Sequence, residues 1–319
     1  MKHKLLWGLL LLFVLAAGAA FYWFRELPGT AHDAADITDL SGLYAANEEI
    51  AAAQKKLADT EPAEVVTTDK SGKRQITLLI DGLPDRPTTA RLLDLFKKHD
   101  VQVAFFVEGQ NAADQPETMK LLKESGQAIG NFTFIGITAA QELPLDALLS
   151  QLCRTQKVIE TLTGDAPSLF RAPRTRFTEP LLKAVKAAGI DKAVWANVVL
   201  ERGRLHSSEE AAAFVEQLPP GSIVAISAGD PVDLKKWEEG KTDERPAIDK
   251  KPTIPLEGPA EASHVDPLAA EVELLLDALE QQGFKVEPIS AFNSIRFIPA
   301  LLTTPLNESL KGQGAQNHG

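Results

Sequence analysis

The stretch ITLLIDGLPDRPTTARLLDLFKKHDVQVAFFVEGQNA, residues 76–112, contains the repeating unit from which most of the chain is built. A short apolar, β-branched run over 75–80 ends at Asp81, and residues 87–99 follow it with the apolar spacing of an amphipathic helix. A second apolar run over 101–107 then predicts another buried strand. A strand, a helix and a second buried strand in this order indicate a parallel sheet covered by helices.

The same alternation continues toward the C-terminus. Short apolar runs predict strands at 127–131, 168–170, 192–198, 222–226 and 284–287. Amphipathic spacing, with Pro near several starts and Gly near several ends, predicts helices that begin at 116, 144, 180, 208 and 267. We therefore expect an α/β fold, a distorted barrel of about seven strand–helix units. A doubly wound sheet is the alternative, and the lack of a glycine-rich phosphate loop after the first strand argues against it.

The N-terminal residues 1–25 predict a membrane anchor. Lys2 and Lys4 precede an unbroken apolar run over 5–24, and a spanning helix needs about 20 such residues. The lysines favour a cytoplasmic N-terminus, which places the remainder in a periplasm or outside the cell. A cleaved signal peptide remains open, because the small residues 17–19 suit a cleavage site, and the protein would then be secreted.

Composition divides the rest of the chain. Residues 26–73 are mostly polar and aperiodic, which predicts a stalk between anchor and domain. Within this stalk, the stretch 43–57 is rich in Ala, Glu and Lys and predicts one helix. The main domain is expected over 74–292, with an inserted surface loop at about 229–262 that is rich in charged residues and proline. Residues 293–319 are expected to form a C-terminal tail.

Charge and cysteine content exclude several classes of site. The formal net charge of −11 argues against nucleic acid as a partner. The chain has one cysteine, Cys153, which excludes a cysteine-ligated zinc site and an internal disulfide. We expect Cys153 to be a small apolar residue on a helix.

The order of several segments resembles the NodB-homology domain of polysaccharide deacetylases, carbohydrate esterase family four. The opening stretch at 76–112 is similar to that family's first strand, helix and second strand. The later segments that carry the resemblance are LLKESGQAIGNFTF (121–134), LFRAPRTRFTEPLLKAVKAAGI (169–190), PPGSIVAIS (219–227) and LLDALEQQGFKVEPIS (275–290). The resemblance spans about 75–290 and implies a distorted barrel of the NodB-homology kind, with a sugar-binding groove at the carboxyl ends of its strands.

The resemblance also implies a chemistry, metal-assisted amide hydrolysis, which this sequence lacks the residues to perform. In the family an aspartate and two histidines hold a divalent metal, commonly zinc, with a second aspartate as base and a late histidine as acid. Here Asp81 matches the base, but Gly82 replaces the metal-binding aspartate. Phe132 and Gly136 replace the two histidines, and Ser227 replaces the late histidine. Because these substitutions remove the family's metal ligands, we expect no metal at these positions.

The lost metal cannot be compensated by one carboxylate. A bound metal lowers the pKa of water from about 16 to about 7, which corresponds to roughly 12 kcal/mol of nucleophile activation. A lone general base supplies about 3 to 5 kcal/mol. Asp81 alone is therefore an insufficient catalyst, and no pair of histidines in the domain has metal-ligand spacing on one helix.

Some positions of the family motifs are retained. The third motif, R-x-P-Y in the family, begins here with Arg171, and the resemblance pairs Arg171 with Asp81 at the pocket floor. We interpret this pair as a buried ion pair kept for folding, with a vestigial catalytic role as the alternative. Arg174 and Arg176 follow, either as a solvated turn or as a cationic rim that binds uronic, phosphate or sulfate groups of a glycan. With Asn131 at the end of the third strand, they form the predicted ligand-binding set.

The sequence thus predicts a membrane-anchored, deacetylase-like pseudoenzyme of the cell envelope. Its predicted partners are a glycan, the membrane through the N-terminal helix, and proteins of envelope or polysaccharide assembly. Two alternatives stay open: an active carbohydrate deacetylase with a remodelled site, and a purely structural envelope protein.

Overall fold

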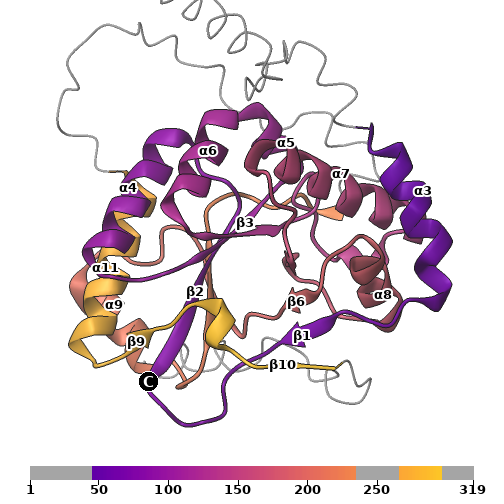
Figure 1. Ribbon diagram of the computed structural model, residues 1–319. Helices are drawn as coiled ribbons and strands as arrows, with labels where there is room; N and C mark the ends of the chain where they lie inside the picture. Colours follow the sequence, from indigo (N-terminus) through magenta and orange to yellow (C-terminus); the bar gives the residue numbers. More distant parts are fainter. Residues whose placement is uncertain (1–44, 235–265, 297–319) are drawn as a thin grey trace, which may run out of the picture. The chain divides into compact units, whose positions relative to one another are not determined.

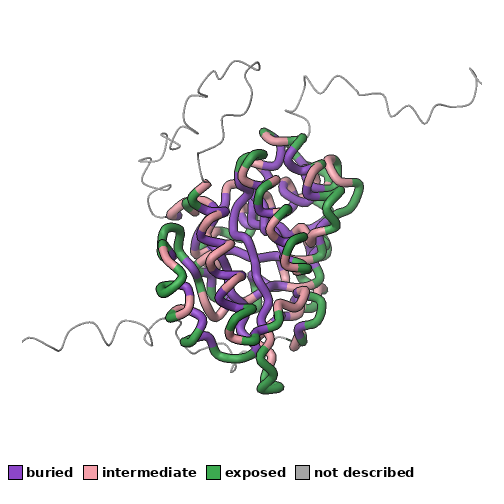
Figure 2. Tube along the Cα trace, turned by 90° about the vertical axis from the view of Figure 1, so that its left-hand side faces the viewer, coloured by how far each residue is buried: buried purple, intermediate pink, exposed green. Residues whose placement is uncertain are grey.

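Buried apolar strands form the centre of the computed structural model of the chain, which describes residues 45–234 and 266–296. All of these residues belong to one compact unit. The strands are β1 (Glu64–Val66), β2 (Gln75–Asp81), β3 (Ala104–Val107), β4 (Ala128–Asn131), β5 (Leu169–Phe170), β6 (Lys192–Val194), β7 (Val198–Leu200), β8 (Ile223–Ser227), β9 (Lys285–Val286) and β10 (Ser294–Ile295). Figure 2 shows the buried strands at the centre and the exposed residues on the periphery.

The strands form one sheet in the order β10-β1-β6-β5-β4-β3-β2-β8-β7, with β9 paired to β2. Every pairing is parallel except that of β1 with β10. Strands β6 and β7, which lie in different parts of this order, are separated only by residues 195–197. The sheet therefore curls into an α/β half-barrel, and the predicted α/β class is confirmed.

The expected strand at 192–198 is divided into β6 and β7 by its polar contacts. The backbone N–H of Trp195 donates to the carbonyl of Val66 in β1, at 3.1 Å. Two residues later, the side-chain oxygen of Asn197 accepts from the backbone N–H of Ile223 in β8, at 2.8 Å. The segment passes from one part of the sheet to the other. Its first half, β6, therefore pairs with β1 and β5, and its second half, β7, pairs with β8.

Helices cover the outside of the sheet (Figure 1). The α-helices are α3 (Asn47–Lys56), α4 (Arg86–Lys98), α5 (Gly109–Asp114), α6 (Pro116–Ser125), α7 (Leu145–Thr163), α8 (Glu179–Ala187), α9 (Ser208–Glu216) and α11 (Pro267–Gln281). Short 3-10 turns are η1 (Leu57–Asp59), η2 (Ala140–Glu142) and η3 (Ile289–Ala291). Apart from α5, each α-helix lies close to an expected one, and α3 lies within the Ala-rich stretch at 43–57.

Local signals explain where these helices begin and end. Asp85 caps α4, because its carboxylate accepts from the backbone N–H of Thr88 at 2.9 Å. Helix α9 is capped by Ser207, because its hydroxyl oxygen accepts from the backbone N–H of Glu210 at 3.2 Å. Helix α7 ends, as expected, at Gly164, which adopts a left-handed conformation with φ 80°.

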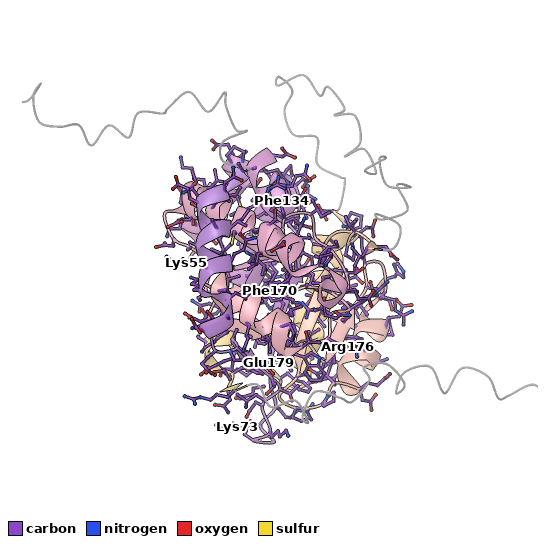
Figure 3. All side chains as sticks on the ribbon, turned by 90° about the vertical axis from the view of Figure 1, so that its right-hand side faces the viewer. Lys55, Lys73, Phe134, Phe170, Arg176 and Glu179 are labelled. Atoms are coloured by element: carbon purple, nitrogen blue, oxygen red, sulfur yellow. The ribbon has the colours of Figure 1, made fainter. Side chains whose placement is uncertain are left out.

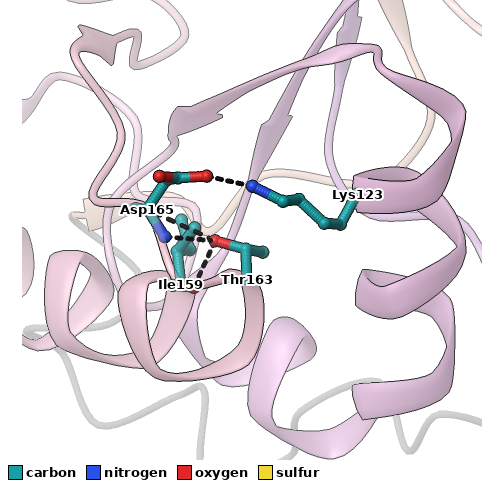
Figure 4. A network of polar contacts seen from close by, with 4 residues as sticks. All are labelled: Lys123, Ile159, Thr163 and Asp165. Atoms are coloured by element: carbon teal, nitrogen blue, oxygen red, sulfur yellow. Dashed lines mark hydrogen bonds and ion pairs between the residues drawn. The ribbon is translucent and has the colours of Figure 1, made fainter.

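Side chains hold the C-terminal end of α7 in place, as Figure 4 shows. The Thr163 hydroxyl donates to the carbonyl of Ile159 at 2.8 Å, and the same oxygen accepts from the backbone N–H of Asp165 at 3.3 Å. Asp165 in turn forms an ion pair with Lys123 of α6. The contact joins two consecutive helices on one face of the sheet.

The predicted stalk at 26–73 is wrong in its C-terminal half, and the predicted tail at 293–319 is wrong in its first residues. Helix α3 packs against α7, with Ala53 buried and Glu49 in an ion pair with Lys157 at 2.7 Å. Strand β1 lies between β6 and β10 in the sheet. Residues 64–66 and 294–295 therefore belong to the sheet, and residues 47–56 belong to the helices that cover it. The sequence signal was weak because β1 has three residues and β10 has two.

Several expectations fall outside the described residues. The anchor at 1–25, most of the inserted loop at 229–262 and the tail from 297 onward belong to this group. Within 45–234 and 266–296, no helix has both the length and the apolar character needed to cross a membrane.

Candidate functional site

The carboxyl ends of three neighbouring strands meet at Asp81. Asp81 is the last residue of β2, and it lies in register with Phe106 of β3 and Ser227 of β8. The backbone carbonyl of Asp81 accepts from the N–H of Ala228, which fixes the turn after β8 beside it. In a parallel α/β sheet this edge is the usual position of a functional site.

Arg171 faces Asp81 from the turn after β5. Its Nε donates to both carboxylate oxygens, with N–O distances of 2.7 and 3.0 Å. The two side chains are 6% and 7% exposed, so this is a buried charge pair. The backbone N–H of Arg171 donates to the carbonyl of Asn131, which positions the turn beside β4. The structure thus brings the two residues together in the way that the resemblance implies.

Gly82 and Gly136 have left-handed backbones as well as no side chains. Gly82 has φ 100° and Gly136 has φ 70°. The first value is strongly disfavoured for residues with a Cβ, and the second lies in the left-handed region that such residues adopt only uncommonly. The loop around Gly136 is held by its carbonyl, which accepts from the N–H of Val232. Both local backbones therefore favour glycine.

Phe132, which replaces one of the family's two metal-binding histidines, is 2% exposed. Phe134 and Phe177 are also buried, at 5% and 8% exposed, so these rings are part of the core. The guanidinium of Arg154 lies over the Phe134 ring, 3.7 Å from its centroid. This loop is therefore stabilised by packing around aromatic side chains.

The site contains one ionisable residue that the sequence analysis missed, Glu108. It directly follows β3 and is 8% exposed. One of its carboxylate oxygens, Oε2, accepts from the backbone N–H of Leu83 at 2.9 Å. Burial raises the pKa of Glu108, and the negative charge of Asp81 raises it further. The site thus holds a second buried carboxyl group near Asp81.

The Glu108 carboxyl lies between the two glycines. A Cβ built on Gly82 would stand 3.2 Å from Oε1 of Glu108, and a Cβ on Gly136 would stand 3.0 Å from its Cγ and 3.3 Å from Oε1. Such spacings are closer than ordinary van der Waals contact. Glu108 therefore fills the space that side chains at these two positions would enter.

A signal for Glu108 was present in the sequence. It is a single charged residue after the apolar run over 104–107, and β3 is the neighbour of β2 in the sheet. Because parallel strands end at the same edge, a residue just after β3 should lie near Asp81. None of the family motifs includes this position.

The structure corrects the prediction for Asn131. Its side chain is completely buried, and its amide nitrogen donates to the carbonyl of Leu152 and to Gln156, both at 3.0 Å. Its side-chain oxygen accepts from the N–H of Thr133 at 2.9 Å. Asn131 is inaccessible to a ligand because its polar atoms are engaged within the domain, so its role is structural.

Arg174 and Arg176 lie on the surface, in the loop between β5 and α8. Figure 3 shows Arg176 on this part of the surface. The loop is held by a bond from the backbone N–H of Arg176 to the side-chain oxygen of Gln141, at 3.0 Å. Within the described part of the chain, neither guanidinium has an ion-pair partner. The expected cationic groups are therefore exposed beside the strand ends.

The donor set does not fit the metal that the family implies. Over the described ranges, no group of three or more His, Cys, Asp and Glu residues could hold a metal ion. Ser227, at the position of the late histidine, donates its hydroxyl to Glu201 at 3.3 Å. Gly82 and Gly136 have no side chain and Phe132 has no donor atom, so these positions provide no metal ligand.

Comparisons with known proteins agree with the fold and the motifs. The sequence profile described as polysaccharide deacetylase matches residues 68–193. A peptidoglycan-N-acetylglucosamine deacetylase from Bacillus cereus is 32% identical over 111 residues, which cover 35% of this chain and 40% of that protein. The peptidoglycan-N-acetylmuramic acid deacetylase PdaA from Bacillus subtilis is 27% identical over 161 residues, which cover 48% and 60%. The chain thus spans less than two thirds of either relative.

Solved structures show the same fold. A pseudoenzyme of carbohydrate esterase family four from Bacillus anthracis superposes with a TM-score of 0.51 at 19% identity, over 73% of this chain and 70% of that one. The resemblance to polysaccharide deacetylases seen in the sequence is therefore confirmed: their profile matches residues 68–193, and the fold is similar to that of the family-four pseudoenzyme.

Proposed function

We propose that this protein binds a cell-envelope glycan at the carboxyl end of its half-barrel without the metal-dependent deacetylation typical of its family. One observation carries the proposal: the Glu108 carboxyl lies between Gly82 and Gly136, where the family has metal ligands. A protein group fills the place of the catalytic centre, while the fold around it is retained.

The energetics of nucleophile activation disfavour hydrolysis at this site. Loss of the metal removes roughly 12 kcal/mol of nucleophile activation, against about 3 to 5 kcal/mol from one general base. Both oxygens of the Asp81 carboxylate also already accept from the Nε of Arg171. Fold and site together favour a protein that has kept the family's architecture for recognition.

The glycan class follows from the exposed arginines and from the relatives. Arg174 and Arg176 offer planar cationic groups, which suit carboxylate, phosphate or sulfate substituents of a polysaccharide. Two relatives are deacetylases of peptidoglycan, whose glycan strands belong to the cell envelope. An anchor at 1–25 would hold the domain near that polymer. A role in organising envelope or polysaccharide-assembly proteins is part of the same proposal.

Metal content tests the catalytic half of the proposal. The full chain, purified in mild detergent and washed with a chelator, is analysed for zinc, nickel and cobalt. We expect far less than one metal ion per chain. Stoichiometric metal that survives the wash would overturn the proposal in favour of an active deacetylase with a remodelled site.

A glycan array tests the binding half. We expect the full chain to bind anionic envelope glycans, and Arg174→Ala together with Arg176→Ala to weaken this binding. Lys73→Ala is the matched control, because Lys73 is exposed and precedes β2, whereas Arg174 and Arg176 follow the carboxyl end of β5. Binding that is absent, or equally strong in both variants, would leave a structural role in the envelope.

A further inference from the structure

We infer that the Glu108 carboxyl excludes a divalent cation from this site, so that restoring the missing ligands alone would not give the chain a metal centre. The inference rests on the proposed loss of metal-dependent activity and adds its cause. Three absent ligands explain why no metal is held. The Glu108 carboxyl would explain why a divalent cation cannot enter the space between Gly82 and Gly136.

The Glu108 carboxyl occupies space that side chains at Gly82 and Gly136 would need. The carboxyl is approached from two different loops, the turn after β2 at Gly82 and the loop after β4 at Gly136. From either position a Cβ would already be 3.0 to 3.3 Å from an atom of Glu108. An aspartate or histidine extends well beyond its Cβ, so a ligand at either position would compete with Glu108 for the same volume.

The Glu108 carboxyl is also held firmly in this space. Its Oε2 accepts from the N–H of Leu83 at 2.9 Å, and the turn after β8 closes the far side, where a Cβ on Gly229 would be 3.9 Å from Oε1. The side chain is 8% exposed. Movement of the carboxyl out of this place would break its bond to Leu83 and leave that N–H without its partner.

The charges of Asp81 and Arg171 also leave little need for a cation at this site. In the family the site holds a divalent cation among an aspartate and two histidines. Here Arg171 already compensates Asp81, and burial favours the neutral form of Glu108. The charge of Asp81 is therefore already compensated without a cation, and an incoming metal would have to displace the Glu108 carboxyl from the space between the two glycines.

Zinc uptake by two matched proteins tests the inference. Both carry Gly82→Asp, Phe132→His and Gly136→His in the full chain, and they differ only in having Glu108 or Glu108→Ala. After incubation with zinc alone and removal of free metal, we expect about one zinc per chain in the Ala protein only. The apparent zinc affinity should differ by at least about tenfold, the lower range for changes next to a metal site.

Two results would overturn the inference. One is equal zinc binding by the two proteins, which would show that Glu108 moves aside or acts as a ligand itself. The other is a failure of both folded proteins to bind zinc, which would place the obstacle in the glycine backbones. Neither result bears on the metal content of the unaltered protein, so the proposed function stands or falls separately.

A double-mutant cycle tests the crowding without rebuilding a site. Gly136→Ala is introduced into the unaltered chain and into the Glu108→Ala chain, and the unfolding equilibrium constants are measured. We expect its effect to be about tenfold smaller without Glu108, within the range of coupling between contacting residues. Gly164→Ala is the control, because Gly164 has φ 80° and no atom within 4 Å of its added Cβ. Additive effects at Gly136, as at Gly164, would contradict the inference.

Discussion

The Nε of Arg171 donates to both carboxylate oxygens of Asp81, at 2.7 and 3.0 Å, across the half-barrel from β5 to β2. Because both groups are buried, removal of one leaves an uncompensated charge in the interior. The pair therefore has a reason to persist independent of catalysis: it joins two strand ends that are not neighbours in the sheet.

The first prediction follows from this pair. Arg171→Ala should lower the free energy of unfolding by about 3 to 5 kcal/mol, measured by denaturant titration. Replacing both residues with apolar ones, Asp81→Leu with Arg171→Met, should cost less than the single change, since no charge is left unpaired. The surface pair of Lys183 and Glu179 is the control, where Glu179→Gln should change stability by about 0.5 kcal/mol or less. An equally small effect at Arg171 would contradict a structural role.

The second prediction concerns the pH dependence of stability at Glu108. Burial raises the pKa of Glu108 in the folded state above the unfolded value of about 4.3. Between these two values the folded state binds more protons, so its stability falls as the pH rises. Glu108→Gln removes the titration and keeps the shape. The variant should therefore gain stability relative to the parent as the pH increases from the unfolded pKa.

Glu209 provides a control of opposite sign. Its own backbone N–H and the Ser207 hydroxyl lower its pKa in the first turn of α9. Its contribution is therefore present above the unfolded pKa and is lost as the pH falls, and Glu209→Gln should show no gain at high pH. Parallel pH curves for the parent and Glu108→Gln would show that Glu108 has no raised pKa.

The sequence was informative where a family motif or a long period existed. Strands β2, β3 and β8 are continuous apolar runs, and the residues at the metal-ligand positions can be read directly. Glu108 could not be found in this way because its importance comes from packing against residues 25 or more positions distant. Short strands such as β1 and β10 carry too few residues for a pattern and are defined by their pairing.

The third prediction concerns the thiol of Cys153. Burial in α7 raises its pKa to about 11, with the charge of Glu49 as a smaller cause. At pH 7 only about one thiol in ten thousand is then ionised, and the thiolate is the reactive form. A disulfide reagent should therefore react with the folded chain more than about 100-fold slower than with the denatured chain. Comparable rates would show that α7 opens readily or that the thiol is accessible.

The fourth prediction tests whether α3 belongs to the domain. Ala53 is 1% exposed on the face of α3 that packs against α7, whereas Ala52 is exposed on the same helix. Ala53→Asp buries a charge without a partner and should lower the free energy of unfolding by about 3 kcal/mol or more. Ala52→Asp introduces the same residue at a neighbouring helical position, so its smaller cost measures helix propensity alone.

The comparison of these two variants separates a packed helix from a stalk. If residues 47–56 served only as a spacer, both substitutions would affect unfolding equally and weakly. A large difference, measured in the full chain by denaturant titration, requires that α3 unfolds together with the sheet. The ion pair of Glu49 with Lys157 and the bond from Gln54 to Asp146 favour that result, because both join α3 to α7.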